Sequence, residues 1–156
     1  MVEGGEDPEF IARRLVILAC EDIGLANPQA MVIANTTFDI LRKIGWPEGR
    51  IPLAECVVYL ASSPKSNSAY LAVDAAIARV RAEGNLPVPL HLRNAPTALM
   101  KKMGYGRDYK YAHDYPGHFV RQQFMPDGLQ GVRFWTPADN PSEQRMAQLH
   151  RDRWGD

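Results

Sequence analysis

The chain has 156 residues, enough for one domain, and folding buries roughly 70% of the surface of an unfolded chain of this length. Its hydrophobic content of 46%, charged content of 23% and formal net charge of zero are ordinary for a globular protein. No apolar run approaches the ~20 residues of a membrane-spanning helix, and the first residues show no signal-peptide pattern, which disfavours an integral membrane protein and a secreted precursor.

Two similar start signals predict the first two helices. Asp7-Pro8 supplies an N-cap and a first-turn proline, and predicts a helix that ends at Gly24. Asn27-Pro28 repeats the signal, and Gly45 is the expected stop of the second helix. Both segments carry a helical period of apolar residues, namely Phe10, Ile11, Leu15, Leu18 and Ile23, and then Met31, Ala34, Phe38, Leu41 and Ile44.

A third helix is predicted from near Pro52 to the Ser62-Ser63-Pro64 break, and a fourth from about Ser66 to Glu83. The third is apolar on nearly every side, so we expect it to be central. We expect Val57 and Tyr70 to be buried where these two helices meet. The fourth helix carries an apolar stripe, Ala69, Tyr70, Val73, Ala76, Ile77 and Val80. Four helices with short connections indicate an all-α, compact helical array.

The remainder of the chain is mostly irregular. Prolines space residues 85–96 into an extended segment, and a short helix follows at 97–103. Residues 105–141 form a long irregular segment whose many aromatic side chains favour packing on the domain. Residues 142–153 are predicted to form a last, mostly polar helix. The whole chain, 1–156, is thus predicted to be a single domain of about five to six helices.

The two cysteines, Cys20 and Cys56, lie far apart within apolar patterns. They are typical of buried thiols in a reducing compartment, although a disulfide between them stays open as an alternative.

Charge is distributed unevenly along the chain. Residues 1–60 carry nine acids and five bases, whereas residues 61–156 carry nine acids and thirteen bases. Five bases against one acid, Asp108, fall within residues 93–110, and such an excess attracts phosphate or an acidic peptide unless it is merely a solvated face. The candidate contacts to DNA or a partner are Arg93, Lys101, Lys102, Arg107, Tyr109 and Lys110.

The stretch YKYAHDYPGH, residues 109–118, suggests chemistry but lacks a complete site. His113 and His118 are five residues apart with Pro116-Gly117 between them, a spacing that does not place two metal ligands on one helical face. The chain contains no Gly-Lys dipeptide and therefore no P-loop, and no Asp-Glu pair that would hold magnesium. We therefore expect no catalytic, cofactor-binding or metal-binding residue in this chain, and no turnover of ATP.

Three long segments carry a family resemblance: EGGEDPEFIARRLVILACEDIGLANPQA, then ASSPKSNSAY, then LPVPLHLRNAPTALMKKMGYGRDYKYAHDYPG. In this order they resemble the C-terminal region of replication-associated recombination protein A, a family of bacterial AAA+ ATPases related to Werner helicase interacting protein. The resemblance covers about residues 1–135, and the last twenty residues match only loosely. It implies that YKYAHDYPGH lies outside the ATPase site and serves packing and hydrogen bonding.

The resemblance also implies a fold related to the oligomerising collar of clamp loaders, with residues 1–25 at the end of the lid-associated region. Members of the family assemble as tetramers and act in the bacterial cytoplasm in DNA replication, recombination and repair at stalled forks, with single-stranded DNA-binding protein as a partner. ATP and magnesium would belong to the upstream ATPase region.

The leading hypothesis is therefore a homo-oligomerisation domain. The alternative is a docking module in which the basic, tyrosine-rich segment binds DNA or the acidic tail of single-stranded DNA-binding protein, with tyrosines stacking on unpaired bases.

Overall fold

A computed structural model describes residues 1–155 of the chain. The sequence predicts one domain, and the structure groups the chain into two compact units. The first unit contains residues 1–74 and 135–148, and the second contains residues 75–134 together with those from Leu149 onward.

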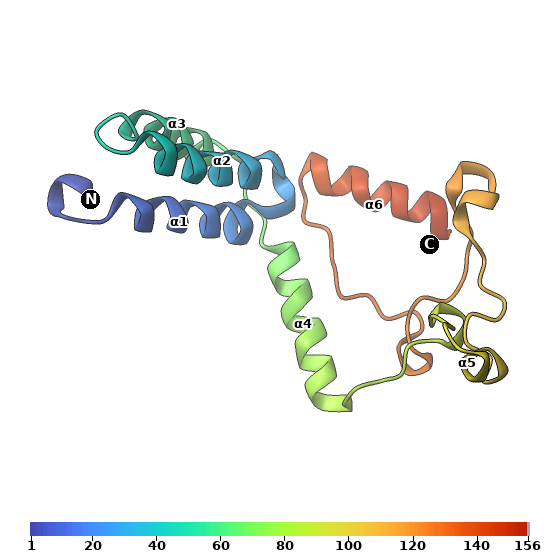
Figure 1. Cartoon of the computed structure of the whole chain (residues 1–156). Helices are drawn as coiled ribbons and strands as arrows, with labels where there is room; N and C mark the ends of the chain where they lie inside the picture. Colours follow the sequence, from blue (N-terminus) through green and yellow to red (C-terminus); the bar gives the residue numbers. More distant parts are fainter. Residues whose placement is uncertain (156) are drawn as a thin grey trace. The chain divides into compact units, whose positions relative to one another are not determined.

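The described residues contain six α-helices and no strand, which confirms the predicted all-α class (Figure 1). The helices are α1 (Pro8–Leu18), α2 (Gln29–Ile44), α3 (Arg50–Ala61), α4 (Ser68–Glu83), α5 (Ala98–Lys102) and α6 (Pro141–Trp154). Between α5 and α6 the chain forms only 3₁₀ turns, as the lack of a sustained period predicts. None of these helices is long and apolar enough to cross a membrane.

Local capping explains where the first helices begin and end. The Asp7 carboxylate accepts a hydrogen bond from the Glu9 N–H at 3.1 Å, as the sequence predicts for an N-cap. After α1 the chain makes one π-helical turn and stops at Gly24, whose φ of 48° suits glycine. Asn27 behaves differently from the prediction, because its side-chain amide donates to Tyr59 and Ser63 at 3.0 Å each and caps nothing.

The core of the first unit lies where α1, α2 and α3 pack side by side. Small side chains on the facing surfaces let the backbones approach closely, and larger residues from α3 fill the remaining space. The buried residues are Ala12, Ala19, Ile23, Ala30, Ala34, Leu41, Leu53, Cys56 and Leu60.

The predicted burial of Val57 and Tyr70 is wrong, since each is 46% exposed. The helix α3 turns Leu53, Cys56 and Leu60 toward the core, which leaves Val57 on another side of the helix. Because α3 is apolar all round, its sequence carried no signal for which side would be buried.

The apolar stripe predicted on the fourth helix is also exposed. In α4 only Ser68 is buried, whereas Tyr70, Val73, Ile77 and Val80 are each more than 40% exposed. The helix itself was predicted correctly, but among residues 1–155 no segment buries its apolar stripe.

The two cysteines differ in their surroundings. Cys20 is exposed, which corrects its predicted burial, because it lies in the π-helical turn beside the buried Ala19. Cys56 is fully buried as predicted, and both thiols are free. Burial raises the pKa of the Cys56 thiol, and a hydrogen bond with Thr37 opposes that shift.

A buried carboxylate, Glu143, joins two distant segments of the first unit. Its two oxygens accept hydrogen bonds from the Ala138 N–H at 2.8 Å and the Asn140 side-chain amide at 3.0 Å. The Glu143 N–H donates in return to the Asn140 side chain at 3.0 Å, so the two residues form a capping box at the start of α6. Hydroxyls of Ser66 and Ser68, at the start of α4, also hydrogen-bond to Glu143.

The network extends to the indole of Trp135, which donates to the Ser68 hydroxyl at 3.0 Å. Burial raises the pKa of the Glu143 carboxyl, but the hydrogen bonds from the two serines, the Ala138 N–H and Asn140 lower it by more. The net pKa of Glu143 lies below the ordinary value of a glutamate, so the carboxyl group is ionised at neutral pH. Hydrogen-bond donors of the protein take the place of water around this buried carboxylate.

We predict that the stability of the chain depends on the charge of Glu143. A folded-state pKa below the unfolded value contributes stability that is complete above about pH 4.3 and is lost as the pH falls through the folded pKa. At neutral pH, Glu143→Gln should lower the free energy of unfolding by about 1–3 kcal/mol, because an amide NH₂ would face N–H donors.

Urea denaturation as a function of pH measures both effects. The exposed Glu48→Gln provides the control and should change little. If Glu143→Gln left the stability and its acid dependence unchanged, the carboxylate would not have the role assigned to it.

Candidate functional site

The two units have opposite charge. The first unit carries twelve acids and seven bases, and the second carries six acids and eleven bases. All four histidines also belong to the second unit. The division of charge is therefore sharper in the fold than along the sequence, and the second unit is the part suited to an anionic ligand.

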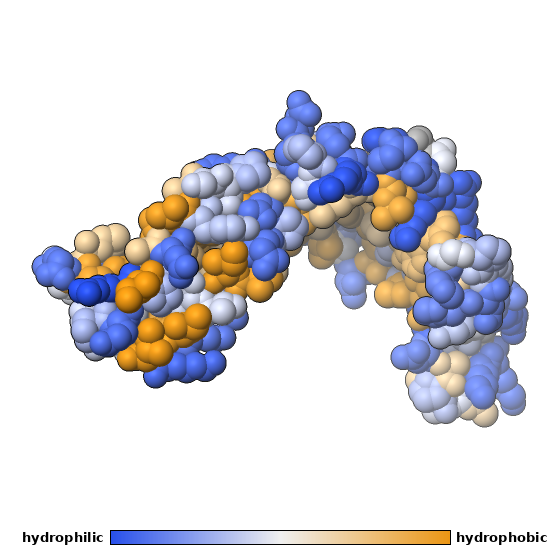
Figure 2. Space-filling model, turned by 90° about the horizontal axis from the view of Figure 1, so that it is seen from above, coloured by the Kyte–Doolittle hydropathy of each residue, from blue (hydrophilic) through white to orange (hydrophobic). Residues whose placement is uncertain are grey.

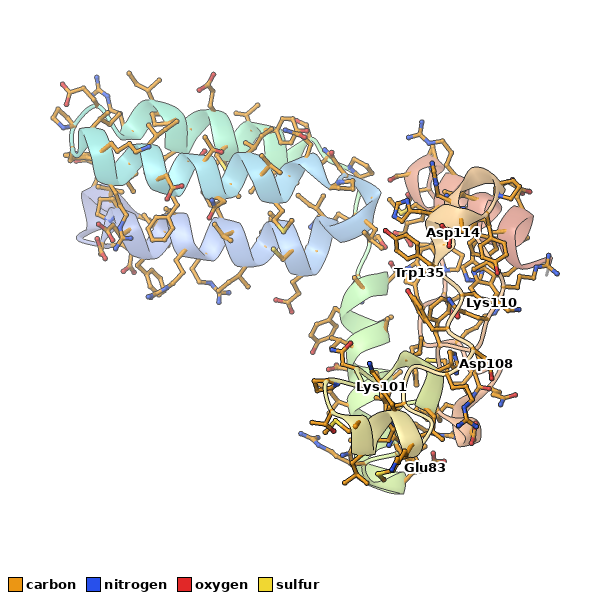
Figure 3. All side chains as sticks on the ribbon, turned by 45° about the vertical axis from the view of Figure 1, so that its right-hand side comes forward. Glu83, Lys101, Asp108, Lys110, Asp114 and Trp135 are labelled. Atoms are coloured by element: carbon orange, nitrogen blue, oxygen red, sulfur yellow. The ribbon has the colours of Figure 1, made fainter. Side chains whose placement is uncertain are left out.

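The helix α5 presents two of the predicted site residues. The Thr97 hydroxyl accepts from the Met100 N–H at 3.2 Å and caps this short helix. Lys101 and Lys102 lie in its last turn, where cations complement the helix dipole, and both are exposed. Figure 3 shows Lys101 on α5 and Lys110 on the irregular segment that follows.

Arg93 links two neighbouring segments of the second unit. Its Nε–H donates to the Val88 carbonyl at 2.6 Å and a terminal N–H donates to the Tyr105 hydroxyl at 3.2 Å. The guanidinium carbon lies 5.1 Å from the centre of the Tyr105 ring, a cation–π distance. The next residue, Gly106, donates from its N–H to the Leu90 carbonyl at 2.9 Å. The Arg93 side chain is thus half-buried and hydrogen-bonded, whereas the other predicted contacts to DNA or a partner are exposed.

The remaining predicted residues lie on the exposed turn after α5. Arg107, Tyr109 and Lys110 are exposed, and Tyr109 retains 50% of its surface. The backbone of Lys110 is fixed by the side-chain amide of Gln122, which accepts from the Lys110 N–H at 3.3 Å and donates to its carbonyl at 3.0 Å. The backbone of Lys110 is therefore fixed, while its side chain is exposed.

The rings of the YKYAHDYPGH stretch contact one another more than they contact a core. The His113 ring lies 5.1 Å from that of Tyr111 and 5.0 Å from that of His118. Tyr111 and Tyr115 are 54% and 38% exposed, so a packing role for this stretch is not confirmed. Among residues 1–155, no three histidine, cysteine or acidic side chains gather as a metal site would require.

Sequence reasoning missed an aromatic pocket elsewhere in the second unit. The Trp154 ring, at the end of α6, meets the edges of Phe119 and Phe124 at centroid distances of 5.3 and 6.0 Å. A cavity of about 360 Å³ lies beside it, lined by residues 122–125 and 130–133 with His150 and Trp154. In the sequence, the one indication of this pocket is the number of aromatic residues after Pro116.

The outer side of α3 forms a second candidate surface, in the first unit. Ile51, Ala54 and Val58 line a shallow hollow of about 560 Å³ between Arg50 and Glu55. Ile51 and Val58 are 60% and 66% exposed. Figure 2 shows apolar side chains at the surface of the part formed by α1–α3. We call this surface the outer α3 face.

Comparison with known proteins gives a consistent result. A family model described as "MgsA AAA+ ATPase C terminal" matches residues 1–154, so the similarity includes the last helix as well. The chain is 42% identical over 149 residues to replication-associated recombination protein A of Coxiella burnetii, covering 95% of this chain and 34% of that protein. It is 46% identical over 151 residues to the protein of the same name in Bacillus subtilis, covering 96% and 36%.

Another relative is ATPase WRNIP1 of Dictyostelium discoideum, 40% identical over 141 residues, which cover 86% of this chain and 16% of that protein. The chain spans about a third of the length of the bacterial relatives.

We predict that substitution of Arg93 lowers the free energy of unfolding more than substitution of the two lysines of α5 does. Arg93→Ala should lower the free energy of unfolding by about 1–2 kcal/mol, because it removes a hydrogen bond and a cation–π contact. Lys101→Glu with Lys102→Glu should stay within about 0.5 kcal/mol of the parent, since exposed charges rarely matter for stability. Urea denaturation followed by circular dichroism compares them. An Arg93→Ala variant of unchanged stability would return Arg93 to the candidate contacts.

Proposed function

Because this chain belongs to the MgsA AAA+ ATPase C-terminal family, we propose that it is the module through which such an ATPase assembles into a homo-oligomer, with a tetramer as the expected state. The chain itself is a non-catalytic domain that contains no P-loop. The observation that carries the proposal is the outer α3 face, where large apolar side chains are exposed on a helix whose opposite side is in the core.

The exposed residues on α3 have the spacing of an interface. Ile51, Ala54 and Val58 follow one another at three and four residues and so form a stripe along one side of the helix. Burying a valine or isoleucine side chain contributes about 1.5–3 kcal/mol, which a second copy of the chain would supply. Beside the stripe, Val32, Ile33 and Ile40 of α2 line a groove of about 460 Å³ that extends the apolar surface.

Charges at the edge of the outer α3 face favour pairing with an identical surface. Arg50 and Glu55 lie on the same helix and border the hollow. In an isologous interface each contact occurs twice, so Arg50 of one copy can meet Glu55 of the other, and the reverse. A surface that carries both signs is complementary to itself.

The relatives' name, replication-associated recombination protein A, suggests the setting. We propose that the complete protein acts in replication, recombination and repair at stalled forks, with ATP and magnesium bound by its ATPase region. Oligomerisation through this domain would then bring several ATPase regions together.

A second candidate function is docking of DNA, or of the acidic tail of single-stranded DNA-binding protein, on the second unit. The exposure of Lys101, Lys102, Arg107, Tyr109 and Lys110 favours it. Arg93 contributes to this surface only indirectly, because it is bonded to Tyr105.

We predict that Val58→Asp abolishes self-association and leaves the monomer folded. Val58 is exposed within one chain, so an aspartate there stays solvated, but burial in an interface would desolvate it at a cost of several kcal/mol. By contrast, Leu60→Asp, in the core, should unfold the chain. Light scattering measures the oligomer and circular dichroism measures the fold.

The control is Leu99→Asp, which places the same charge at an apolar position of similar exposure in the second unit. It should leave the oligomer intact. The parent oligomer should also persist at about 0.5 M salt, because apolar burial is not screened by ions. A monomeric parent at tens of micromolar protein, or an oligomer that survives Val58→Asp, would contradict the assignment of this face.

A further inference from the structure

We propose that the buried hydrogen-bond network that Glu143 forms with Ser66, Ser68, Trp135 and Asn140 is a clasp that restrains the motion of the second unit relative to the first. All of these residues belong to the first unit. Three features of the fold support this role: the places where the chain passes between the units, the residues that hold those passages, and the weak apolar attachment of α6. The restraint is separate from self-association.

The chain passes between the two units three times. The first passage lies within α4, after Asp74, the second lies immediately before Trp135, and the third lies within α6, after Gln148. Two of the three passages are therefore parts of continuous α-helices. Because successive turns of a helix are hydrogen-bonded to one another, the direction in which each helix leaves the first unit depends on how its beginning is held there.

All three passages are held by the Glu143 network. Ser68 is the first residue of α4, Glu143 lies in the first turn of α6, and Trp135 is the first residue of the chain after its return to the first unit. The Ser68 hydroxyl joins the other two, since it accepts from the Trp135 indole N–H at 3.0 Å and hydrogen-bonds to the Glu143 carboxylate. One buried hydroxyl thus connects the three segments that lead into the second unit.

The charge of Glu143 gives these hydrogen bonds a fixed direction. An ionised carboxylate only accepts, and the Ser68 hydroxyl has a single hydrogen to donate. The hydrogen is therefore directed to Glu143, and a lone pair of the hydroxyl oxygen accepts the Trp135 N–H. A buried network in which every member is satisfied makes its surroundings rigid, whereas loss of one member leaves the others without partners. The clasp therefore depends on each of its members.

The beginnings of α4 and α6 differ in what else holds them. The Ser66 N–H, just before α4, donates to the Asp22 carbonyl at 2.8 Å, so the backbone there is attached to the end of the first helical segment. The buried residues of α6 are Glu143 and Ala147. Because an alanine methyl group buries little apolar area, α6 relies mainly on Glu143 for its place in the first unit. Breaking the network should therefore loosen α6 more than α4.

The test measures the width of the distance distribution between one spin label in each unit, by pulsed electron paramagnetic resonance on the whole chain. Cys20 is an exposed thiol of the first unit, whereas Cys56 is fully buried and should not react. Leu99→Cys adds a thiol at an exposed position of the second unit. Diluting the labelled chain into an excess of unlabelled chain removes distances between copies.

Ser68→Ala should broaden the distribution, because it removes the hydroxyl that connects the three segments, and Glu143→Gln should broaden it as well. The matched control is Ser62→Ala, the same substitution at an exposed serine of the first unit outside the network, which should keep the width of the parent. Circular dichroism on the same samples should show unchanged helical content in Ser68→Ala.

Two results would overturn the proposal. One is an equal width in Ser68→Ala and Ser62→Ala. The other is loss of helical content in both network variants, because the network would then be required for folding and would not act as a restraint on motion. Light scattering reports self-association independently, so failure of the clasp would leave the proposed function standing, and the converse also holds.

Discussion

The first unit depends on one buried negative charge. Glu143 lies about seventy-five residues after Ser66 and Ser68 along the chain, yet all three share one hydrogen-bond network. An ionised carboxylate without partners would be very costly in this position, so the network must be complete for residues 135–148 to join α1–α3 and the start of α4. Apolar packing of α1 on α2 gives this unit its bulk, and Glu143 fixes where the returning chain attaches.

Features that depend on neighbouring residues could be predicted from the sequence, and those that depend on distant partners could not. The Asp7 cap and the stops at Gly24 and Gly45 follow from local backbone chemistry. The helices were expected within a few residues of their ends, except that the α-helical part of the first ends at Leu18 and a π-helical turn continues to Ile23. The buried side of α3 was not predictable, since an apolar residue on every side leaves no amphipathic signal. Asn27 carried a capping signal but found two better partners, Tyr59 and Ser63, more than thirty residues away.

The candidate surfaces show the same division. Lys101, Lys102 and Lys110 were identified by local charge, and the structure leaves them exposed. Arg93 has the same charge but lies within reach of Tyr105, which only the fold reveals. The pocket at Trp154 combines residues from 122–133 with the end of α6, and no local pattern connects these segments. The acidic unit thus presents an apolar face, and the basic unit presents exposed rings.

The return of the chain at Glu143 also determines how freely the intervening segment can change in length. The free energy of closing a flexible loop grows only with the logarithm of its length, about 0.6 kcal/mol for each doubling. The chain between the two serines and Glu143 is already long, so a few residues added to or removed from the irregular part between α5 and α6 would alter closure by only a small fraction of that value. The first unit therefore places little constraint of its own on the length of this segment, as long as the attachment at Glu143 is kept.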